Sequence, residues 1–250
     1  MNESQDGKGW VLVTGGTRGI GRGLVEAFAA DGHEAVFTYQ HAVDTADGLE
    51  RSIALAGGRA QGLCCDCTDD EAVGALAREL IARRGAPRAV INNIGITRDA
   101  ALLRMSSEQW HAVINANLHS AFYVTRHFVG AMVERGDGVI LQMSSVSGIK
   151  GNIGQTNYGA TKAALIGMTR SLALELSRFN VRVNSVVPGF IATEMVAKIP
   201  EAQQAALKKS IPLRRFGRVQ EVAALCRFLV SEDAAYMTGQ TFVIDGGLAA

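Results

Sequence analysis

The sequence predicts an α/β protein in which one parallel sheet is covered by helices on both faces. Three observations lead to this expectation: seven apolar runs of strand length recur along the 250 residues, helical segments alternate with them, and no linker rich in proline or serine divides the chain. Strands that alternate with helices form parallel sheets buried on both faces. Such sheets commonly form one domain at this length, so we expect a single domain over residues 1–250.

Each element follows from a local pattern. Between the first two apolar runs, Leu24, Ala27 and Phe28 share one helical face, and Gly32 supplies the stop. Long helices are expected over 106–131 and 155–179, and the irregular stretch over 190–218 is expected to form a lid over the substrate. The strands are predicted from short apolar, often β-branched runs at residues 10–14, 34–39, 60–65, 88–92, 138–144, 181–187 and 241–245.

The composition is that of a soluble globular protein. Apolar residues make up 48% and charged residues 20% of the chain, and 25 basic against 24 acidic side chains leave a net charge of +1. This balance indicates neither a nucleic-acid nor a membrane partner. The first ten residues, MNESQDGKGW, contain two acids and no apolar run, so we expect neither signal peptide nor anchor and place the protein in the cytoplasm.

Four cysteines are present; Cys64, Cys65 and Cys67 stand close together, and Cys226 stands alone. Neighbouring cysteines on a strand point to opposite faces, and no histidine or second cysteine pair lies at ligand spacing. We therefore expect no metal site and interpret the cysteines as reduced, partly buried thiols.

A glycine-rich turn follows the first predicted strand and opens the first predicted helix. In VLVTGGTRGIGRG, the residues Gly15, Gly19 and Gly21 have the spacing Gly-x-x-x-Gly-x-Gly. A backbone without side chains lets a pyrophosphate approach a helix N-terminus, where free N–H groups and the helix dipole favour anions. The turn therefore predicts a dinucleotide-phosphate site, and a tight turn without a ligand is the alternative.

This turn and four further segments, in order, resemble the short-chain dehydrogenase/reductase family over nearly the whole chain. The segments are NNIG at 92–95, NANLHSAF with Asn117, MSSVSG with Ser145 followed by Tyr158 and Lys162, and VVPGFIATEM. The resemblance implies a Rossmann-like, doubly wound, seven-stranded parallel sheet and a nicotinamide cofactor. It also implies that Asn117, Ser145, Tyr158 and Lys162 are the catalytic residues.

The end of the second predicted strand bears on the choice of cofactor. NAD-preferring sites usually place an acid there to bind the ribose 2′-hydroxyl, but this strand ends FTYQH, with no carboxylate before Asp44. Arg18 resembles the arginine with which the family selects NADPH, so NADPH is expected. Asp66 resembles the acid that holds the adenine, and a helix N-cap is a second role for it.

The resemblance assigns the remaining cofactor contacts by position. The expected set is Gly15, Thr17, Arg18, Gly19, Ile20, Gly21, Thr38, Asp66, Asn93, Gly95, Tyr158, Lys162, Pro188, Gly189, Ile191 and Thr193.

Tyr158 and Lys162 stand four residues apart in TNYGATKAAL and so share one helical face. A free tyrosine titrates near pH ~10, and a nearby cation lowers that pKa toward the range useful for acid–base catalysis. By resemblance, Lys162 also binds the nicotinamide ribose, Ser145 holds the substrate oxygen, and Asn117 supports a water relay. The expected reaction is hydride transfer from NADPH to a carbonyl carbon with a proton from Tyr158.

Within the family, INNIGITRDAALLRM, IPLRRFGR and MTGQTFVIDGG are most similar to segments of 3-oxoacyl-[acyl-carrier-protein] reductases and acetoacetyl-CoA reductases. This similarity implies a β-ketoacyl thioester of acyl carrier protein or CoA as substrate, in fatty-acid or polyketide-type biosynthesis. A carrier protein is acidic, so we expect arginines beside the active-site mouth, with Arg135 and Arg178 as candidates. Another alcohol, sugar or steroid dehydrogenase and a non-catalytic cofactor-binding protein are the alternatives.

The two long predicted helices indicate self-association, because they carry apolar residues beyond the stripe that one sheet needs. The resemblance implies a homotetramer with one two-fold interface made by these helices and another by the last helix and strand. The apolar residues on which this rests are Ala121, Phe122, Val124, Ala164, Leu165 and Met168.

Overall fold

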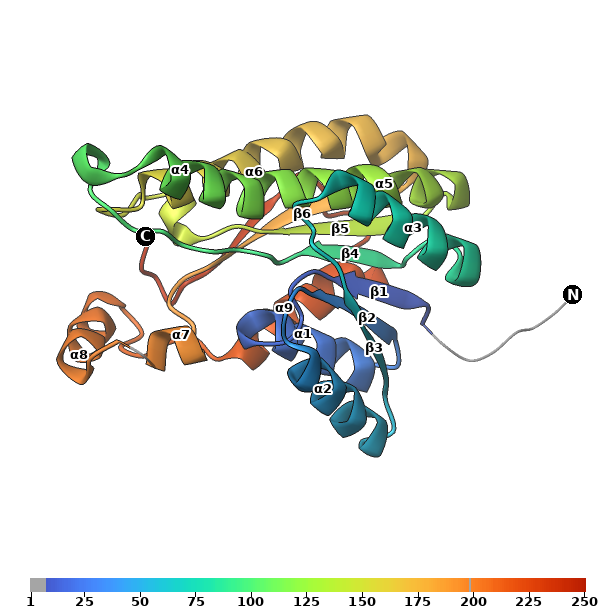
Figure 1. Cartoon of the computed structure of the whole chain (residues 1–250), viewed down its shortest axis with the longest axis horizontal. Helices are drawn as coiled ribbons and strands as arrows, with labels where there is room; N and C mark the ends of the chain where they lie inside the picture. Colours follow the sequence, from blue (N-terminus) through green and yellow to red (C-terminus); the bar gives the residue numbers. More distant parts are fainter. Residues whose placement is uncertain (1–7, 198) are drawn as a thin grey trace, which may run out of the picture.

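A computed structural model describes residues 8–197 and 199–250, which form one parallel sheet between two layers of helices (Figure 1). The seven-stranded sheet has the order β3-β2-β1-β4-β5-β6-β7. The predicted Rossmann-like, doubly wound sheet is confirmed, and every predicted strand end lies within one residue of the observed one. The strands are β1 (Trp10–Val13), β2 (Glu34–Tyr39), β3 (Arg59–Cys64), β4 (Ala89–Asn92), β5 (Gly138–Met143), β6 (Val181–Pro188) and β7 (Thr241–Ile244).

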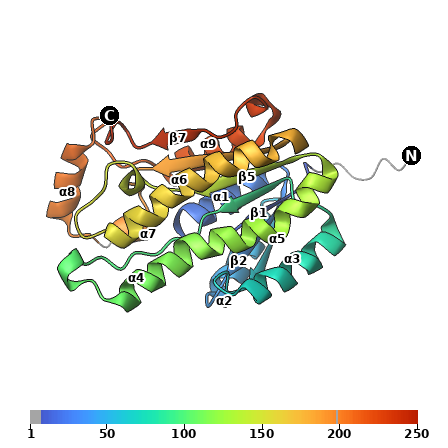
Figure 2. The same ribbon diagram turned by 90° about the horizontal axis from the view of Figure 1, so that it is seen from above.

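Helices cover the two faces of the sheet in separate groups (Figures 1 and 2). On one face, α1 and α9 pack around Phe28 and Cys226, and on the other, α3 and α5 pack around Phe128 and Met132. The central strands β1, β5 and β6 are buried along their whole length, as expected for a parallel sheet with two covered faces. The helices are α1 (Gly19–Ala30), α2 (Val43–Leu55), α3 (Asp70–Arg84), α4 (Ser107–Ile114), α5 (Ser120–Arg135), α6 (Thr156–Leu176), α7 (Glu194–Ala197), α8 (Glu201–Ser210) and α9 (Val219–Val230).

Side-chain caps explain where several helices begin. Asp69 caps α3, because its Oδ1 accepts hydrogen bonds from the backbone N–H groups of Glu71 and Ala72. Ser106 and Gln109 form a capping box at the start of α4. The N-cap role considered for Asp66 is therefore wrong: the helix begins three residues later than that role requires.

The helix expected over 106–131 is interrupted. It consists of α4, a π-helical segment at Asn115–His119, and α5, which continues to Arg135. The helix expected over 155–179 is α6 followed by a single 3₁₀ turn at Ser177–Phe179. A π segment within a longer helix is rare and frequently marks a functional site.

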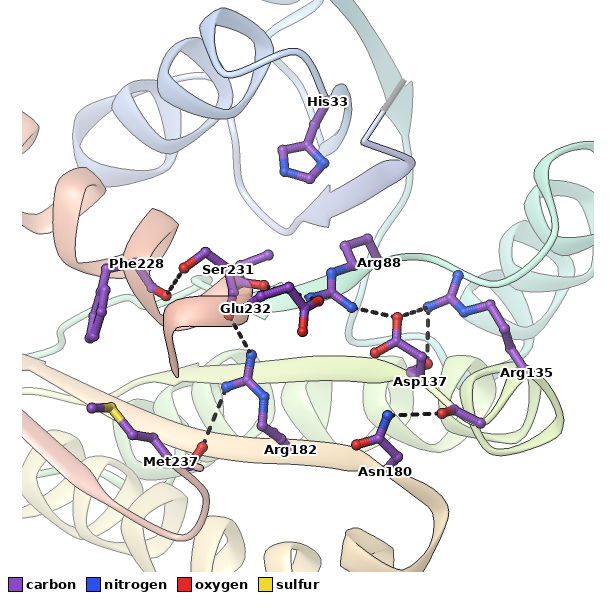
Figure 3. A network of polar contacts seen from close by, with 12 residues as sticks. His33, Arg88, Arg135, Asp137, Asn180, Arg182, Phe228, Ser231, Glu232 and Met237 are labelled. Carbon is purple, nitrogen blue, oxygen red and sulfur yellow. Dashed lines mark hydrogen bonds and ion pairs between the residues drawn. The ribbon is translucent and has the colours of Figure 1, made fainter. Parts of the chain in front are cut away.

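A polar network closes the amino ends of β4, β5 and β6 (Figure 3). Arg88 pairs with Asp137 and also with Glu232, 2.6 Å from its Nη2. Arg182 donates to the backbone carbonyl oxygens of Ser231 and Met237 at 3.2 and 3.4 Å. Functional groups in open parallel sheets gather at the opposite, carboxyl ends of the strands, so this network has a structural role.

The two ends of the sheet are thus different in kind. α7 and α8 extend beyond the carboxyl ends of the strands (Figures 1 and 2). Both helices lie within the stretch 190–218 that was expected to be irregular. Among the described residues, no helix is both long and apolar enough to cross a bilayer.

Candidate active site

The glycine turn joins β1 to α1 beneath the carboxyl edge of the sheet. Gly15 and Gly19 have φ of +67° and +54°, a backbone region that favours glycine. A Cβ atom on Gly21 would lie 2.2 Å from the carbonyl oxygen of Gly15, so this position also excludes any side chain. Among the described residues no side chain caps α1, so its first N–H groups remain available to an anion. This cradle fits a pyrophosphate.

A latch from β4 holds that turn in place. The Asn93 side chain donates from Nδ2 to the carbonyl oxygens of Thr14 and Gly15, at 2.9 and 3.2 Å. In return, Thr14 Oγ1 accepts the backbone N–H groups of Asn93 and Ile94. The NNIG segment therefore connects the two strands that flank the topological switch point, where ligands bind in doubly wound sheets.

The π segment places Asn117 inside the protein. Asn117 is fully buried; its Oδ1 accepts the backbone N–H of Ile96 at 2.8 Å, and its Nδ2 donates to the Ile96 carbonyl oxygen and to Thr161 Oγ1. These bonds join the loop after β4 to helix α6. The extra residue of the π turn directs this amide toward the loop.

Ser145, Tyr158 and Lys162 meet where β5 ends and α6 begins. Lys162 Nζ lies 5.5 Å from the centre of the Tyr158 ring and donates to the Met143 carbonyl oxygen at 2.7 Å. Gly95 approaches the same ammonium, because a Cβ there would lie 3.2 Å from Lys162 Nζ. The structure thus brings together the four residues predicted to be catalytic, since Asn117 reaches α6 through Thr161.

The electrostatics of this pair differ from the expectation. Burial raises the pKa of Tyr158 above its ordinary value, while the neighbouring Ser145 side chain acts in the lowering direction. Burial also lowers the pKa of Lys162 to about 8. The expected lowering of the Tyr158 pKa by Lys162 is wrong, because desolvation of the buried phenol outweighs the effect of its neighbours. The phenol therefore keeps its proton at neutral pH.

Three supporting residues were not predicted. Asn157 is fully buried and donates from Nδ2 to the carbonyl oxygens of Arg98 and Gln109, while its Oδ1 accepts the N–H of Tyr158. Thr161 donates to the Tyr158 carbonyl oxygen, and Ser144 donates to that of Lys162 at 2.7 Å. The sequence feature that could have revealed them is position, because each stands immediately before a predicted catalytic residue.

The residues expected at the adenine end lie at the ends of β2 and β3. Thr38 is buried, and its hydroxyl accepts the N–H of Gly15 at 3.2 Å, so Thr38 supports the turn from below. Asp66 accepts from Gln40 Nε2 at 2.8 Å and from both the N–H and the hydroxyl of Thr68. Arg18 is the exposed residue immediately before α1.

The segment after β6 approaches the glycine turn from the other side. Gly189 donates its N–H to the Ile244 carbonyl oxygen, and Ile191 is buried in a bridge to Gly217. The Thr193 methyl group lies 3.6 Å from where a Cβ on Gly19 would stand. A cleft of about 540 Å³ opens here between α1, α7 and α9.

Comparison with known proteins agrees with this geometry. A family model described as enoyl-(acyl carrier protein) reductase matches residues 15–249. The chain belongs to the short-chain dehydrogenase/reductase family. Relatives of this short-chain reductase include 3-oxoacyl-[acyl-carrier-protein] reductases of Thermotoga maritima, Pseudomonas aeruginosa and Escherichia coli, which are 42%, 40% and 38% identical over 237 residues. Each match covers 95% of this chain and 96% of the relative.

Membership fixes the general chemistry of the site. The protein is an oxidoreductase, and its family implies a nicotinamide cofactor. The residues present fit such a group: the glycine cradle suits a pyrophosphate, and the absence of a side chain at Gly95 lets the loop after β4 pass close to Lys162 Nζ. Among the described residues, no three His, Cys, Asp or Glu side chains are arranged to hold a metal ion.

The two arginines that we expected beside the mouth of the active site lie at the opposite edge of the sheet. Arg135 ends α5, and Arg178 follows α6, so both precede strands and lie at the amino edge of the sheet. Arg135 donates to the backbone carbonyl oxygens of residues 86, 87 and 137. Figure 3 shows its contact with Asp137. The expectation failed because position in the sequence next to a helix end does not indicate which end of the sheet that residue reaches.

Proposed function

We propose that the protein reduces a 3-oxoacyl thioester to the 3-hydroxyacyl thioester, with NADPH as the reductant and an acyl carrier protein or CoA as the thioester carrier. The observation that carries the proposal is the convergence of Ser145, Tyr158 and Lys162 beside the glycine turn in a chain whose relatives act as 3-oxoacyl-[acyl-carrier-protein] reductases. Fatty-acid biosynthesis is the primary setting, and a polyketide-type pathway is a second one.

In this proposal each side chain has one task. A bound nicotinamide supplies hydride to the carbonyl carbon. Ser145 holds the carbonyl oxygen and stabilises the alkoxide that develops there. Tyr158 donates the proton to that oxygen, which suits a phenol whose pKa is raised and whose proton is present at neutral pH. Lys162 orients the cofactor ribose, and Asn117 holds the relay that returns a proton to Tyr158.

Exposed apolar side chains near the carboxyl edge support an acyl substrate. The segment with Leu102 and Leu103 and the segment with Ile153 are joined by a hydrogen bond from the N–H of Ala100 to the carbonyl oxygen of Gly154. Leu103 and Ile153 are 100% and 98% exposed in the isolated chain. Large exposed apolar groups beside a polar site are typical of a surface that binds an apolar ligand. Residues 190–218, of which position 198 lies outside the described residues, are proposed as a lid over the substrate.

NADPH preference rests on charge. The described residues 38–43 at the end of β2 include no carboxylate, and Arg18 is exposed beside the turn. A 2′-phosphate placed there would meet the Arg18 guanidinium, and among the described residues the only acid bonded to this strand end is Asp66, which accepts from Gln40. The remaining assigned contacts, at Gly15, Thr17, Gly19, Ile20, Gly21, Asp66, Asn93, Gly95, Pro188, Gly189, Ile191 and Thr193, complete the proposed cofactor site.

We also propose that the chain works as one domain, assembled as a homotetramer. Phe122 on α5 and Leu174 on α6 are 46% and 84% exposed, and Val243 on the edge strand β7 is 47% exposed. Ala121, Val124 and Leu165 are buried in the chain's own core, so the interface depends on fewer residues than expected.

The decisive experiment measures NADPH oxidation by the purified protein with three thioesters: acetoacetyl carrier protein, acetoacetyl-CoA and crotonyl-CoA. We expect turnover with one or both 3-oxoacyl thioesters and none with the 2-enoyl thioester. Tyr158→Phe fills the same space without the proton donor and should retain less than about 1% of the activity, the scale of general acid catalysis. Reduction of crotonyl-CoA alone would instead assign the activity named in the family model.

A further inference from the structure

The loop after β4 is hydrogen-bonded to the segment that leads into α6 along a continuous stretch, which we call the seam. Three consecutive residues of the loop, 98 to 100, each take part in one bond. The bonds run from the Ala100 N–H to the Gly154 carbonyl oxygen at 2.9 Å, from Gln155 Nε2 to Asp99 Oδ2 at 2.9 Å, and from Asn157 Nδ2 to the Arg98 carbonyl oxygen at 3.1 Å. The seam therefore fixes the start of α6 against the loop.

Gln155 is the centre of the seam, because both ends of its side-chain amide are bonded. An ionised Asp99 can only accept hydrogen bonds, so the NH₂ group of Gln155 must face it. The Gln155 Oε1 atom then accepts from the Ser147 hydroxyl at 2.9 Å and from Asn152 Nδ2 at 3.2 Å. The carboxylate of Asp99 thus fixes the orientation of the whole amide.

Gln155 connects on two sides to residues that carry the proposed reaction. Ser147, whose hydroxyl it binds, donates its backbone N–H to Ser145 Oγ at 3.3 Å. Gln155 is also the residue immediately before α6, and its carbonyl oxygen accepts the N–H of Gly159 at 2.7 Å, which closes the first turn around Tyr158. One residue therefore reaches both the serine that would hold the substrate oxygen and the tyrosine that would give the proton.

The charge of Asp99 also acts on the phenol. Burial raises the pKa of Tyr158, the Ser145 side chain lowers it, and the negative charge of Asp99 raises it. A nearby carboxylate disfavours a phenolate, so Asp99 favours the protonated form that a proton donor needs. Asp99 is itself exposed, which means that it can be replaced without opening the core.

We propose that Asp99 and Gln155 are positioning residues for the reaction. Their hydrogen bond holds the turn after Ser145 and the start of α6 against the loop after β4, so that Ser145 and Tyr158 meet the same substrate oxygen. The roles of Ser145 and Tyr158 in this inference rest on the proposed function. A displacement of reacting groups by about 1 Å can lower turnover about 100-fold, so a pair that only orients them has a large effect on the rate.

The test exchanges the two functional groups of the pair. Gln155→Glu removes the donor and sets two carboxylates against each other, so it should lower kcat by about tenfold or more. Adding Asp99→Asn restores one donor and one acceptor in reversed positions, and the double variant should recover most of the lost kcat. Asp99→Asn alone leaves a neutral acceptor, whose bond is about half as strong, and should lower kcat by a smaller factor.

Steady-state kinetics of the purified full chain and NADPH fluorescence titration separate positioning from binding. We expect kcat and kcat/KM to fall together in Gln155→Glu, while KM and the NADPH dissociation constant change by less than about twofold. Asp99→Ala removes the same bond without adding a charge, and it should give the same pattern even if Gln155→Glu folds poorly. Glu108→Gln, which removes an exposed carboxylate from α4, is the matched control and should leave kcat unchanged.

Hydrogen exchange at the Ala100 amide reads the seam in the protein without ligands. Exchange should be faster in Gln155→Glu and close to the wild-type rate in the double variant. This measurement, and turnover of whichever carbonyl compound the wild type reduces, still test the pair if the 3-oxoacyl thioester proves to be the wrong substrate. The inference is overturned if the double variant is no more active than Gln155→Glu, if the loss appears in KM with kcat unchanged, or if exchange at Ala100 does not change.

Discussion

Lys162 donates from Nζ to the backbone carbonyl oxygen of Met143 at 2.7 Å, and its side chain is only 3% exposed. Burial lowers the pKa of this ammonium group to about 8 from an ordinary value of 10.5. This lowering of the pKa corresponds to a free-energy cost of about 3 kcal/mol for keeping the ammonium charged inside the folded protein at neutral pH. A charge retained at such a cost is typical of a functional site.

Replacing this lysine should therefore stabilise the protein while inactivating it. Lys162→Met removes the buried charge and keeps most of the volume, but it leaves the Met143 carbonyl oxygen without its donor. We expect the free energy of unfolding to rise by roughly 1–2 kcal/mol, measured by urea denaturation at pH 7. The exposed Lys150→Met change is the matched control and should alter it by less than about 0.5 kcal/mol. A destabilised Lys162→Met protein would show that the Lys162 ammonium makes a net stabilising contribution to the folded state.

The same group should make stability depend on alkaline pH. Between pH 8 and 10.5 the unfolded chain holds the Lys162 proton while the folded chain releases it, so the unfolded state binds more protons. The contribution of Lys162 to stability therefore rises with pH through this window and is constant below it. Parallel urea titrations of the wild type and Lys162→Met should converge between pH 8 and 10. A difference that stays constant over this range would place the lysine pKa elsewhere.

Catalysis should respond to pH in the opposite direction. Activity that needs the Lys162 ammonium should be lost as pH rises through about 8, so kcat/KM should fall on that side. The measurement is kcat/KM for the 3-oxoacyl thioester from pH 6 to 10 at fixed ionic strength. A flat profile up to pH 10 would mean that the charge is not required.

Arg18→Ala should narrow the preference for NADPH over NADH. Loss of a charge-assisted hydrogen bond to a phosphate should reduce the difference in binding free energy by roughly 1.5–3 kcal/mol, measured by fluorescence titration of both nucleotides. Arg22→Ala is a matched control, because Arg22 is one turn further along α1 and pairs with Glu26. Equal affinities of the wild type for NADPH and NADH would contradict the NADPH preference that we infer from the end of β2.

Light scattering at micromolar concentration should give a species near four chains of 26.5 kDa. Phe122→Glu, on the proposed interface, should lower the mass because a buried charge is strongly unfavourable at an interface. Leu55→Glu, on α2 and 90% exposed, should not change it. A single 26.5 kDa species in the wild type would refute the assembly.

Local patterns predicted the sheet well because each strand is a short apolar run set between helices. They failed where tertiary packing decides. The π segment around Asn117 depends on a hydrogen bond to Ile96, which no helical period in the sequence reveals. The raised pKa of Tyr158 depends on burial by residues distant in the chain, and the location of Arg135 depends on which end of the sheet its helix reaches.

The latch between Thr14 and Asn93 also limits how the chain can be divided. The residues it joins are 79 positions apart, and its bonds are what fix the carbonyl groups of the glycine turn. A fragment that ended before β4 would contain every glycine of the motif, with β1 and α1 complete, yet would lack these bonds. The glycine motif is therefore continuous in the sequence, but its conformation depends on residues after β4. Grafting the motif alone onto another protein should not transfer nucleotide affinity.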